Sequence, residues 1–212
     1  MKKSETLKDK IYNDVFDGII KGEYLSDQIL SEKSLMEKFK TSKAPVREAL
    51  IELCNEGILR SIPRYGYEII KLTDNDVSDI QKFRIILECE CLSRYWDMIT
   101  PDHIAQLEQI ITEDYANCTE YNAIVHWENN SRFHLLLMSF FKNQYIYNTI
   151  KSSLSILTRA YAQFYWDKWH TTQFKTSAGC HDKFIKCLKS NDKYGAIKAL
   201  EWDLSGFDEK II

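Results

Sequence analysis

Two cations at the start of one short stretch are the first residues in this sequence that suggest chemistry. In the stretch from Thr41 to Leu50, Lys43 and Arg47 stand four residues apart. Ser42 is a favourable N-cap, so we expect a helix to begin there and to present unpaired amides, a hydroxyl and two positive charges. The amides and the helix dipole act in the same direction, which suits binding of a polyanion. The alternative is an ordinary surface helix with a common cap.

A second group of polar residues lies where the apolar pattern predicts burial. Asn130 and His134 are four residues apart on one predicted helix and therefore share a face. His181 and Asp203 lie on two later predicted helices. Two imidazoles and a carboxylate from three helices can bind a divalent cation and leave coordination positions open. Alternatively, the histidines are hydrogen-bonded core residues and the aspartate is solvated or ion-paired.

Arg84 and Arg159 are candidates for binding an anionic small molecule. A buried guanidinium can hold a carboxylate through two parallel hydrogen bonds. Aromatic residues follow Arg159, Tyr165 among them, and such a cluster suits the wall of an apolar pocket. The alternatives are an ion pair from Arg84 to Glu88, one turn later, and an aromatic stripe that forms core or a dimer seam.

Composition and charge limit the class of protein. The chain has 212 residues, 44% of them hydrophobic and 28% charged, and a net charge of −3. These values are typical of a soluble globular protein with one large or two small domains. The net charge argues against a protein that coats nucleic acid by bulk attraction. Between residues 33 and 47, however, five cations face a single acid, Glu37.

The sequence carries no sign of membrane insertion or export. It has no apolar run long enough to cross a bilayer, and its start is charged rather than apolar. We therefore expect a cytoplasmic protein whose six cysteines are reduced thiols.

The first third of the chain predicts three helices and a β-hairpin. Apolar residues recur at helical spacing in three segments, and two runs of branched and aromatic residues follow. The turn Pro63-Arg64-Tyr65-Gly66 joins these two runs. A helix-turn-helix followed by a hairpin with a cationic, aromatic tip is typical of a winged helix that binds DNA. The predicted elements are helices 5–21, 32–39 and 42–57, and strands 58–62 and 67–70.

This region resembles the winged-helix domain of GntR-family bacterial transcription regulators. The similarity lies in the runs Leu30-Ser31-Glu32-Lys33-Ser34-Leu35 and Ser42-Lys43-Ala44-Pro45-Val46-Arg47-Glu48-Ala49-Leu50, and in the hairpin tip. Lys43 stands where the family more often has arginine, so we assign Lys43 to a phosphate and base reading to Arg47. The resemblance implies that operator DNA contacts Lys33, Ser42, Lys43, Arg47, Arg64, Tyr65 and Gly66.

Beyond Leu72 the sequence predicts helices only. Thr100 and Pro101 are a typical helix start. Six helices imply a bundle, in whose core facing side chains can build a ligand site. We therefore expect a mainly α protein, with a winged helix-turn-helix over residues 1–72 and an all-α six-helix domain over residues 73–212. The predicted helices are 74–98, 101–116, 120–141, 145–169, 176–190 and 192–207.

The second half is similar to the FCD effector domain of the FadR branch of the GntR family, in its six-helix variant. In that domain an Asp-x-x-x-His pair and two later histidines bind a metal that receives a carboxylate effector. The resemblance implies one divalent ion, such as Zn, Ni or Mn. Two positions differ, because Asn130 replaces the aspartate and Asp203 replaces the last histidine. The implied ligands are Asn130, His134, His181 and Asp203.

Together these features predict a homodimeric transcription regulator. By family habit it is a repressor that binds palindromic double-stranded operator DNA and senses a small carboxylate. One alternative is a metal-dependent enzyme fused to a DNA-binding module, which would use the same polar group to activate water. No general base presents itself for that reaction. The other alternative is an adaptor whose bundle binds only protein partners.

Overall fold

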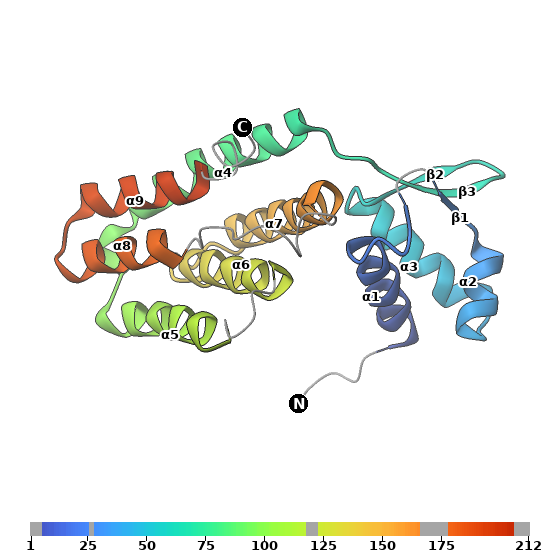
Figure 1. The fold of residues 1–212 in the computed structure, drawn as a ribbon, viewed down its shortest axis with the longest axis horizontal. Coiled ribbons are helices and arrows are strands. Elements are labelled where there is room, and N and C mark those ends of the chain that lie inside the picture. The colour runs from blue at the N-terminus through green and yellow to red at the C-terminus, as the bar shows by residue number, and fades with distance from the viewer. Residues whose placement is uncertain (1–5, 26–27, 118–122, 166–177, 206–212) are drawn as a thin grey trace. The chain divides into compact units, whose positions relative to one another are not determined.

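The chain folds into two compact units in the computed structural model, whose elements are labelled in Figure 1. The structure describes residues 6–25, 28–117, 123–165 and 178–205. The first unit comprises Met1–Thr73 and Ile156–Asp167, and the second comprises Asp74–Ser155 and Lys168–Ile212. Within the described ranges there are nine α-helices and three short strands, which confirms the predicted mainly α fold.

The first unit has a three-helix core with a small sheet beside it. Apolar side chains of α1 and α3 pack together, and Ile11, Val15, Val46 and Leu50 are completely buried there. Thr6 caps α1 through a capping box with Asp9. The elements are α1 (Leu7–Ile20), β1 (Ile29–Leu30), α2 (Glu32–Phe39), α3 (Lys43–Asn55), β2 (Leu59–Ile62) and β3 (Gly66–Ile69).

The sheet contains one strand that the sequence did not predict. The hairpin of β2 and β3 forms as expected, but β1 pairs with β3 on its other side, so the strand order is β1-β3-β2. The prediction of a loop through Leu30 was wrong at this point. A two-residue strand has no local pattern of its own, and it exists here because Ile29 and Leu30 pair with Glu68 and Tyr67.

The second unit is entirely helical. In it α4 packs along α9, α8 packs against α9, and α5 contacts both α6 and α8 (Figure 1). Fully buried side chains such as Leu92, Leu107, Phe133 and Phe184 form its core. The elements are α4 (Asp74–Arg94), a 3₁₀ helix (Trp96–Met98), α5 (Pro101–Asn117), α6 (Ala123–Ser139), α7 (Gln144–Tyr165), α8 (Ala178–Lys189) and α9 (Lys193–Ser205). Of these, α7 is divided between the units, because its residues from Ile156 onward belong to the first.

Most predicted helix boundaries lie close to the observed ones. The start of α5 is as expected, because the Thr100 hydroxyl accepts the backbone N–H of His103 at 3.2 Å and Pro101 follows as the first helical residue. In contrast, α4 was predicted to continue to about Met98 but ends at Arg94, and the separate 3₁₀ helix Trp96–Met98 follows it. The predicted ends at 120–122, 166–169, 176–177 and 206–207 lie outside the described residues.

No helix in the described part of the chain combines the length and the apolar character that crossing a bilayer requires. The cysteines that the structure describes form no disulfide.

Candidate functional site

The amino-terminal end of α3 is exposed, as the sequence predicted. Val46 and Leu50 are buried on one side of this helix, whereas Lys43 and Arg47 are exposed on the other. Ser42 has the extended backbone of an N-cap, but its side chain makes no capping hydrogen bond, so that part of the prediction was wrong. The exposed hydroxyl and the first amides of α3 therefore remain available to an anionic ligand.

A carboxylate that the sequence did not assign to this surface lies beside Lys43. Glu32, the first residue of α2, has Oε2 2.8 Å from Lys43 Nζ, and its Oε1 accepts the Tyr67 hydroxyl at 3.2 Å. The hydrogen bond from Lys43, opposed by partial burial and helped by the charges of Lys43 and Arg47, lowers the pKa of Glu32. Glu32 is therefore ionised and in contact with both α3 and the hairpin.

The hairpin tip is exposed and strained. Arg64 has a left-handed backbone (φ 71°), and Tyr65 is 73% exposed. Gly66 also has a positive φ (136°), and a Cβ there would overlap the carbonyl oxygen of Leu30. Glycine is therefore required at position 66 for packing against β1, independently of any DNA contact. Lys33, on α2, is exposed as well.

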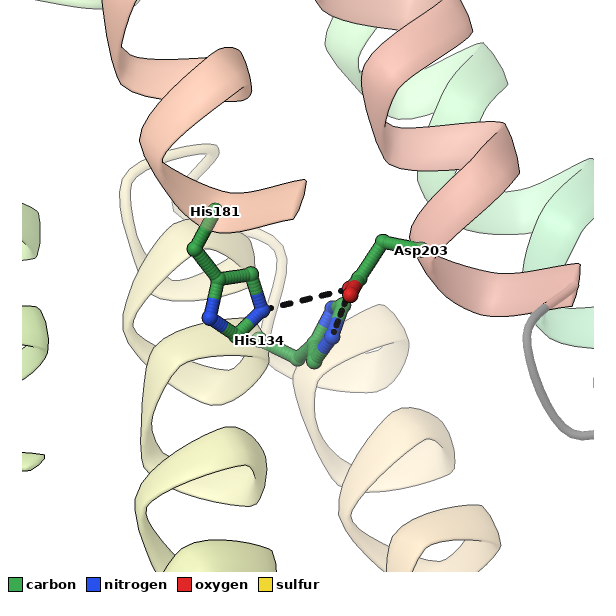
Figure 2. Close-up of side chains that lie close together, drawn as sticks. All are labelled: His134, His181 and Asp203. Atoms are coloured by element: carbon green, nitrogen blue, oxygen red, sulfur yellow. Dashed lines mark hydrogen bonds and ion pairs between the residues drawn. The ribbon is translucent and has the colours of Figure 1, made fainter. Parts of the chain in front are cut away.

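Three of the four predicted metal ligands converge in the second unit. His134 lies on α6, His181 on α8 and Asp203 on α9, and Figure 2 shows their side chains pointing toward one another. Asp203 Oδ2 is 3.0 Å from His134 Nε2 and 3.2 Å from His181 Nε2. The side chains of His134, His181 and Asp203 are 1%, 7% and 4% exposed, and the His181 ring stacks on Phe133 with centroids 3.9 Å apart.

The contacts continue from His134 to α4. His134 Nδ1 lies 2.7 Å from Glu88 Oε2, and Glu88 Oε1 accepts from Arg84 Nε, also at 2.7 Å. The predicted Arg84–Glu88 ion pair is thus confirmed, and it extends to the histidine on α6. Five residues form this series, which we call the buried polar chain: Arg84, Glu88, His134, Asp203 and His181.

The charges in the buried polar chain support one another. Burial alone would raise the pKa of Glu88, but the positive charges of Arg84 and His134 outweigh it and lower that pKa. Burial would likewise raise the pKa of Asp203, and His181 together with His134 lowers it instead. Burial opposes protonation of His134, yet the Glu88 carboxylate raises the pKa of this imidazole. A protonated His134 can thus donate to both carboxylates.

The same donor set fits a divalent metal. The ligand atoms of His134, His181 and Asp203 all lie within 4.8 Å of one another. The Asp203 distances of 3.0 and 3.2 Å match the separation of about 3.0–3.5 Å between two ligands that each lie about 2.1 Å from one ion. A carboxylate on the second ring nitrogen, here Glu88, is the usual support of a ligating histidine. Asn130 is buried one turn before His134 and stays a predicted fourth ligand.

Two buried polar atoms on α4 have no hydrogen-bond partner among the described residues. They are Arg84 Nη2 and Gln81 Oε1, on side chains that are 3% and 4% exposed. Buried polar groups are nearly always paired, so an open donor and an open acceptor call for a partner, either a buried water or a bound molecule. Sequence reasoning missed Gln81, although Gln81, Arg84 and Glu88 follow Val77 at helical steps on one face of α4.

The structure gives less support to the predicted effector roles of Arg159 and Tyr165. Arg159 is buried, and its Nη1 donates to the carbonyl oxygen of Gly57 at 2.9 Å, within the first unit. That contact gives Arg159 a packing role at the end of α3. The side chain of Tyr165 lies outside what the structure describes. Both effector roles stay predictions.

Two family models match the chain. Residues 7–69 match the model for bacterial regulatory proteins of the gntR family, and residues 79–204 match the FCD domain. The second match covers more than half of the chain.

Relatives with known names are regulators as well. The HTH-type transcriptional regulator YdhC of Bacillus subtilis is 30% identical over 67% of this chain and 64% of its own length. The gluconate operon transcriptional repressor of Bacillus licheniformis is 26% identical over 91% of this chain and 80% of its own. The repressor RspR of Escherichia coli is 29% identical over 61% and 57%. The match thus spans less than two thirds of YdhC and RspR.

Solved structures agree on the fold. Escherichia coli McbR/YncC has a TM-score of 0.79 at 18% identity, and a GntR regulator from Rhodococcus sp. RHA1 has 0.73 at 18%. Each comparison covers 96% of both chains. The family and the named relatives are transcription regulators, so the enzyme alternative is set aside. The chain belongs to the GntR family of bacterial transcription regulators and carries an FCD domain.

Proposed function

We propose that this regulator is a homodimeric, cytoplasmic repressor that binds palindromic operator DNA through residues 1–72 and senses a small carboxylate through residues 73–212. Relatives named as repressors, two of gluconate operons and RspR, support repression. The exposed start of α3 and the exposed hairpin tip support the DNA contacts. In this proposal the contacting residues are Lys33, Ser42, Lys43, Arg47, Arg64, Tyr65 and Gly66.

The observation that carries the sensing role is that Arg84 Nη2 and Gln81 Oε1, on side chains three residues apart on α4, are both buried without a hydrogen-bond partner. Arg84 Nε donates to Glu88, and Nη2 is a second donor to which a carboxylate oxygen could bind. A hydroxyl group would donate to the Gln81 oxygen. A hydroxylated carboxylate provides both groups, and the gluconate operon repressors among the relatives support that class.

A divalent metal would complete the site. Nε2 of His134, Nε2 of His181 and Oδ2 of Asp203 would hold it, with Asn130 as a fourth ligand. When bound, such an ion supplies a Lewis-acidic position for a carboxylate oxygen. Glu88 accepts the Nδ1–H of His134 and so keeps Nε2 directed at Asp203, while Arg84 holds Glu88 in place.

Response to the effector would be a population shift. A ligand seated between helices favours whichever dimer arrangement binds it better. Repression is relieved if, in that arrangement, the distance between the two recognition helices no longer matches the spacing of the half-sites, which is about one DNA turn.

Selection of duplexes from a random DNA pool with the purified full chain tests the DNA-binding half of the proposal. We expect a palindrome whose half-sites are about 10 bp apart, bound by a dimer in light scattering. Gluconate and related hydroxycarboxylates should weaken binding in fluorescence anisotropy. Selection of a single unrepeated site, or binding by a monomer, would contradict the dimer. A chain that no hydroxycarboxylate stabilises thermally would favour the protein-partner adaptor instead.

Metal analysis tests the cluster. His181→Ala should reduce the metal bound to protein purified without chelator, whereas His103→Ala, whose ring stacks on Phe140 outside the cluster, should not. Saturating metal at about a hundredfold excess over its dissociation constant should stabilise the wild type by about 2.7 kcal/mol. The metal role is wrong if the wild type carries none and Zn, Ni and Mn leave its melting temperature unchanged.

A further inference from the structure

Glu32 places a fixed carboxylate among the cations of the proposed DNA-binding surface. Its two oxygens contact Lys43 on α3 and Tyr67 on β3, and the charge of Arg47 also acts on it. The contacts join the first turn of α2 to the helix expected to enter the groove and to the strand that leads from the hairpin tip. Among the residues that the structure describes, no other carboxylate has a hydrogen bond or ion pair with both of these elements.

The two members of the Glu32–Lys43 pair differ in freedom. The Glu32 side chain is 22% exposed, lies in the first turn of a capped helix and is held by the buried Tyr67. The Lys43 side chain is 62% exposed. A lysine is a flexible point charge, so without a fixed partner it can follow any nearby phosphate. Glu32 therefore favours one position of the Lys43 ammonium.

Holding Lys43 does not prevent it from binding DNA. An ammonium has three donors, so it can keep Glu32 and still donate to a phosphate placed at the right point. The pair is largely in water and weak, and it orients Lys43 without trapping it. Elsewhere on the surface, the negative charge of Glu32 repels a backbone that approaches in the wrong register.

We propose that Glu32 determines specificity by restricting Lys43 to the phosphate position reached when α3 is fully seated in its operator. The inference rests on the DNA contacts of α3 proposed above. In a seated complex the fixed ammonium anchors the register that places Arg47 over its base pair. On other sequences that phosphate position is not offered, and Lys43 contributes little.

The test compares operator and non-operator affinity over a range of salt concentrations for the full-length wild type and Glu32→Gln. The amide keeps the shape of Glu32 and removes its charge. We expect non-operator affinity to rise about fivefold, because one charge at contact distance is released. For non-operator DNA, the slope of log affinity against log salt concentration should become steeper by about 0.9, the value expected for one added phosphate contact. Operator affinity should change less than about twofold, so discrimination falls about fivefold.

Three variants control the comparison. Glu37→Gln removes the same charge from an exposed position of α2 and should leave discrimination unchanged. In a Lys43→Met background, Glu32→Gln should no longer steepen the salt dependence. Tyr67→Phe removes the hydroxyl that holds Glu32 and keeps its charge, so it should lower discrimination by a smaller amount. If Glu32→Gln does not fold, Tyr67→Phe tests the role of Glu32 in its place.

Two results would overturn the role of Glu32. Equal losses on operator and non-operator DNA with an unchanged salt dependence would reduce it to a structural residue. A Glu37→Gln variant that behaves like Glu32→Gln would reduce the effect to net charge. A wild type that selects no operator would overturn the proposed function as well, so the two failures are distinguishable.

Discussion

The start of α3 and the interior of the FCD domain use similar charge pairs in opposite surroundings. Lys43 pairs with Glu32 while its side chain is 62% exposed, whereas Arg84, Glu88 and His134 pair with side chains no more than 4% exposed. An exposed pair contributes about 0–1 kcal/mol. Breaking a buried pair costs about 3–5 kcal/mol, because a charge is left without a partner. The surface pair can therefore accept a DNA phosphate as an additional partner, while the buried polar chain holds a fixed geometry.

The largest expected effect is in the buried polar chain. Glu88→Ala leaves the Arg84 guanidinium and the His134 imidazole without their shared carboxylate. We expect a loss of about 3–5 kcal/mol in the free energy of unfolding, measured with urea. Glu90→Ala on the same helix is the control, because Glu90 is exposed and pairs only with Arg94 in the recorded contacts. Similar losses in the two variants would remove the distinction between the regions.

The pH dependence of stability sharpens the comparison. In chelator-treated protein, the lowered pKa values of Glu88 and Asp203 mean that their contribution is present above about pH 4 and is lost on acidification. The raised pKa of His134 means that its contribution is complete below about pH 6.5 and is lost as pH rises through the folded-state pKa. We expect the melting temperature to be highest between these values.

Added metal should change the alkaline side of that profile. Ligation requires a neutral His134, so metal affinity should increase as pH rises, and binding should release a proton. Calorimetry in two buffers of different ionisation enthalpy measures this release. If one proton is released, the free energy of metal binding changes with pH by at most about 1.4 kcal/mol per pH unit. A metal affinity that does not change with pH would contradict ligation by His134.

A smaller effect is expected at the DNA-binding surface. Arg47→Ala should weaken operator binding by about 1–3 kcal/mol and relax selectivity at one base pair. Stability should hardly change, because Arg47 is exposed. Anisotropy with a series of single-base-pair operator variants makes the measurement. If every sequence loses the same affinity, Arg47 contacts a phosphate rather than a base.

The smallest effect is expected for the pair that crosses the hairpin. Arg60 faces Glu68 in the β2–β3 register, and Arg60 Nε donates to the carboxylate at 3.1 Å. The Arg60 side chain is 67% exposed, so Arg60→Gln should cost less than about 1 kcal/mol in thermal unfolding. A cost as large as that of Glu88→Ala would show that exposure does not govern these pairs.

Local patterns predicted the helices, the hairpin and the polar residues on the buried faces of the bundle helices. The steps from Val46 to Leu50 identified the buried side of α3, and the i,i+4 spacing identified the Arg84–Glu88 pair. These predictions succeed because backbone periodicity alone determines which side chains share a face. The strand β1 could not be predicted, since it exists only through its pairing with the distant strand β3. Nothing in the structure explains why Ser42 makes no capping bond.

The sequence by itself determined that two imidazoles and a carboxylate lie on buried faces of three helices, and that two cations begin an exposed helix. Only the tertiary structure decided that Glu88 completes the contact of His134 and that Glu32 holds Lys43. The physical reason is that helical spacing fixes directions within one element. Pairing between elements depends on packing, which brings residues 46 or 11 positions apart in the chain to within 2.8 Å.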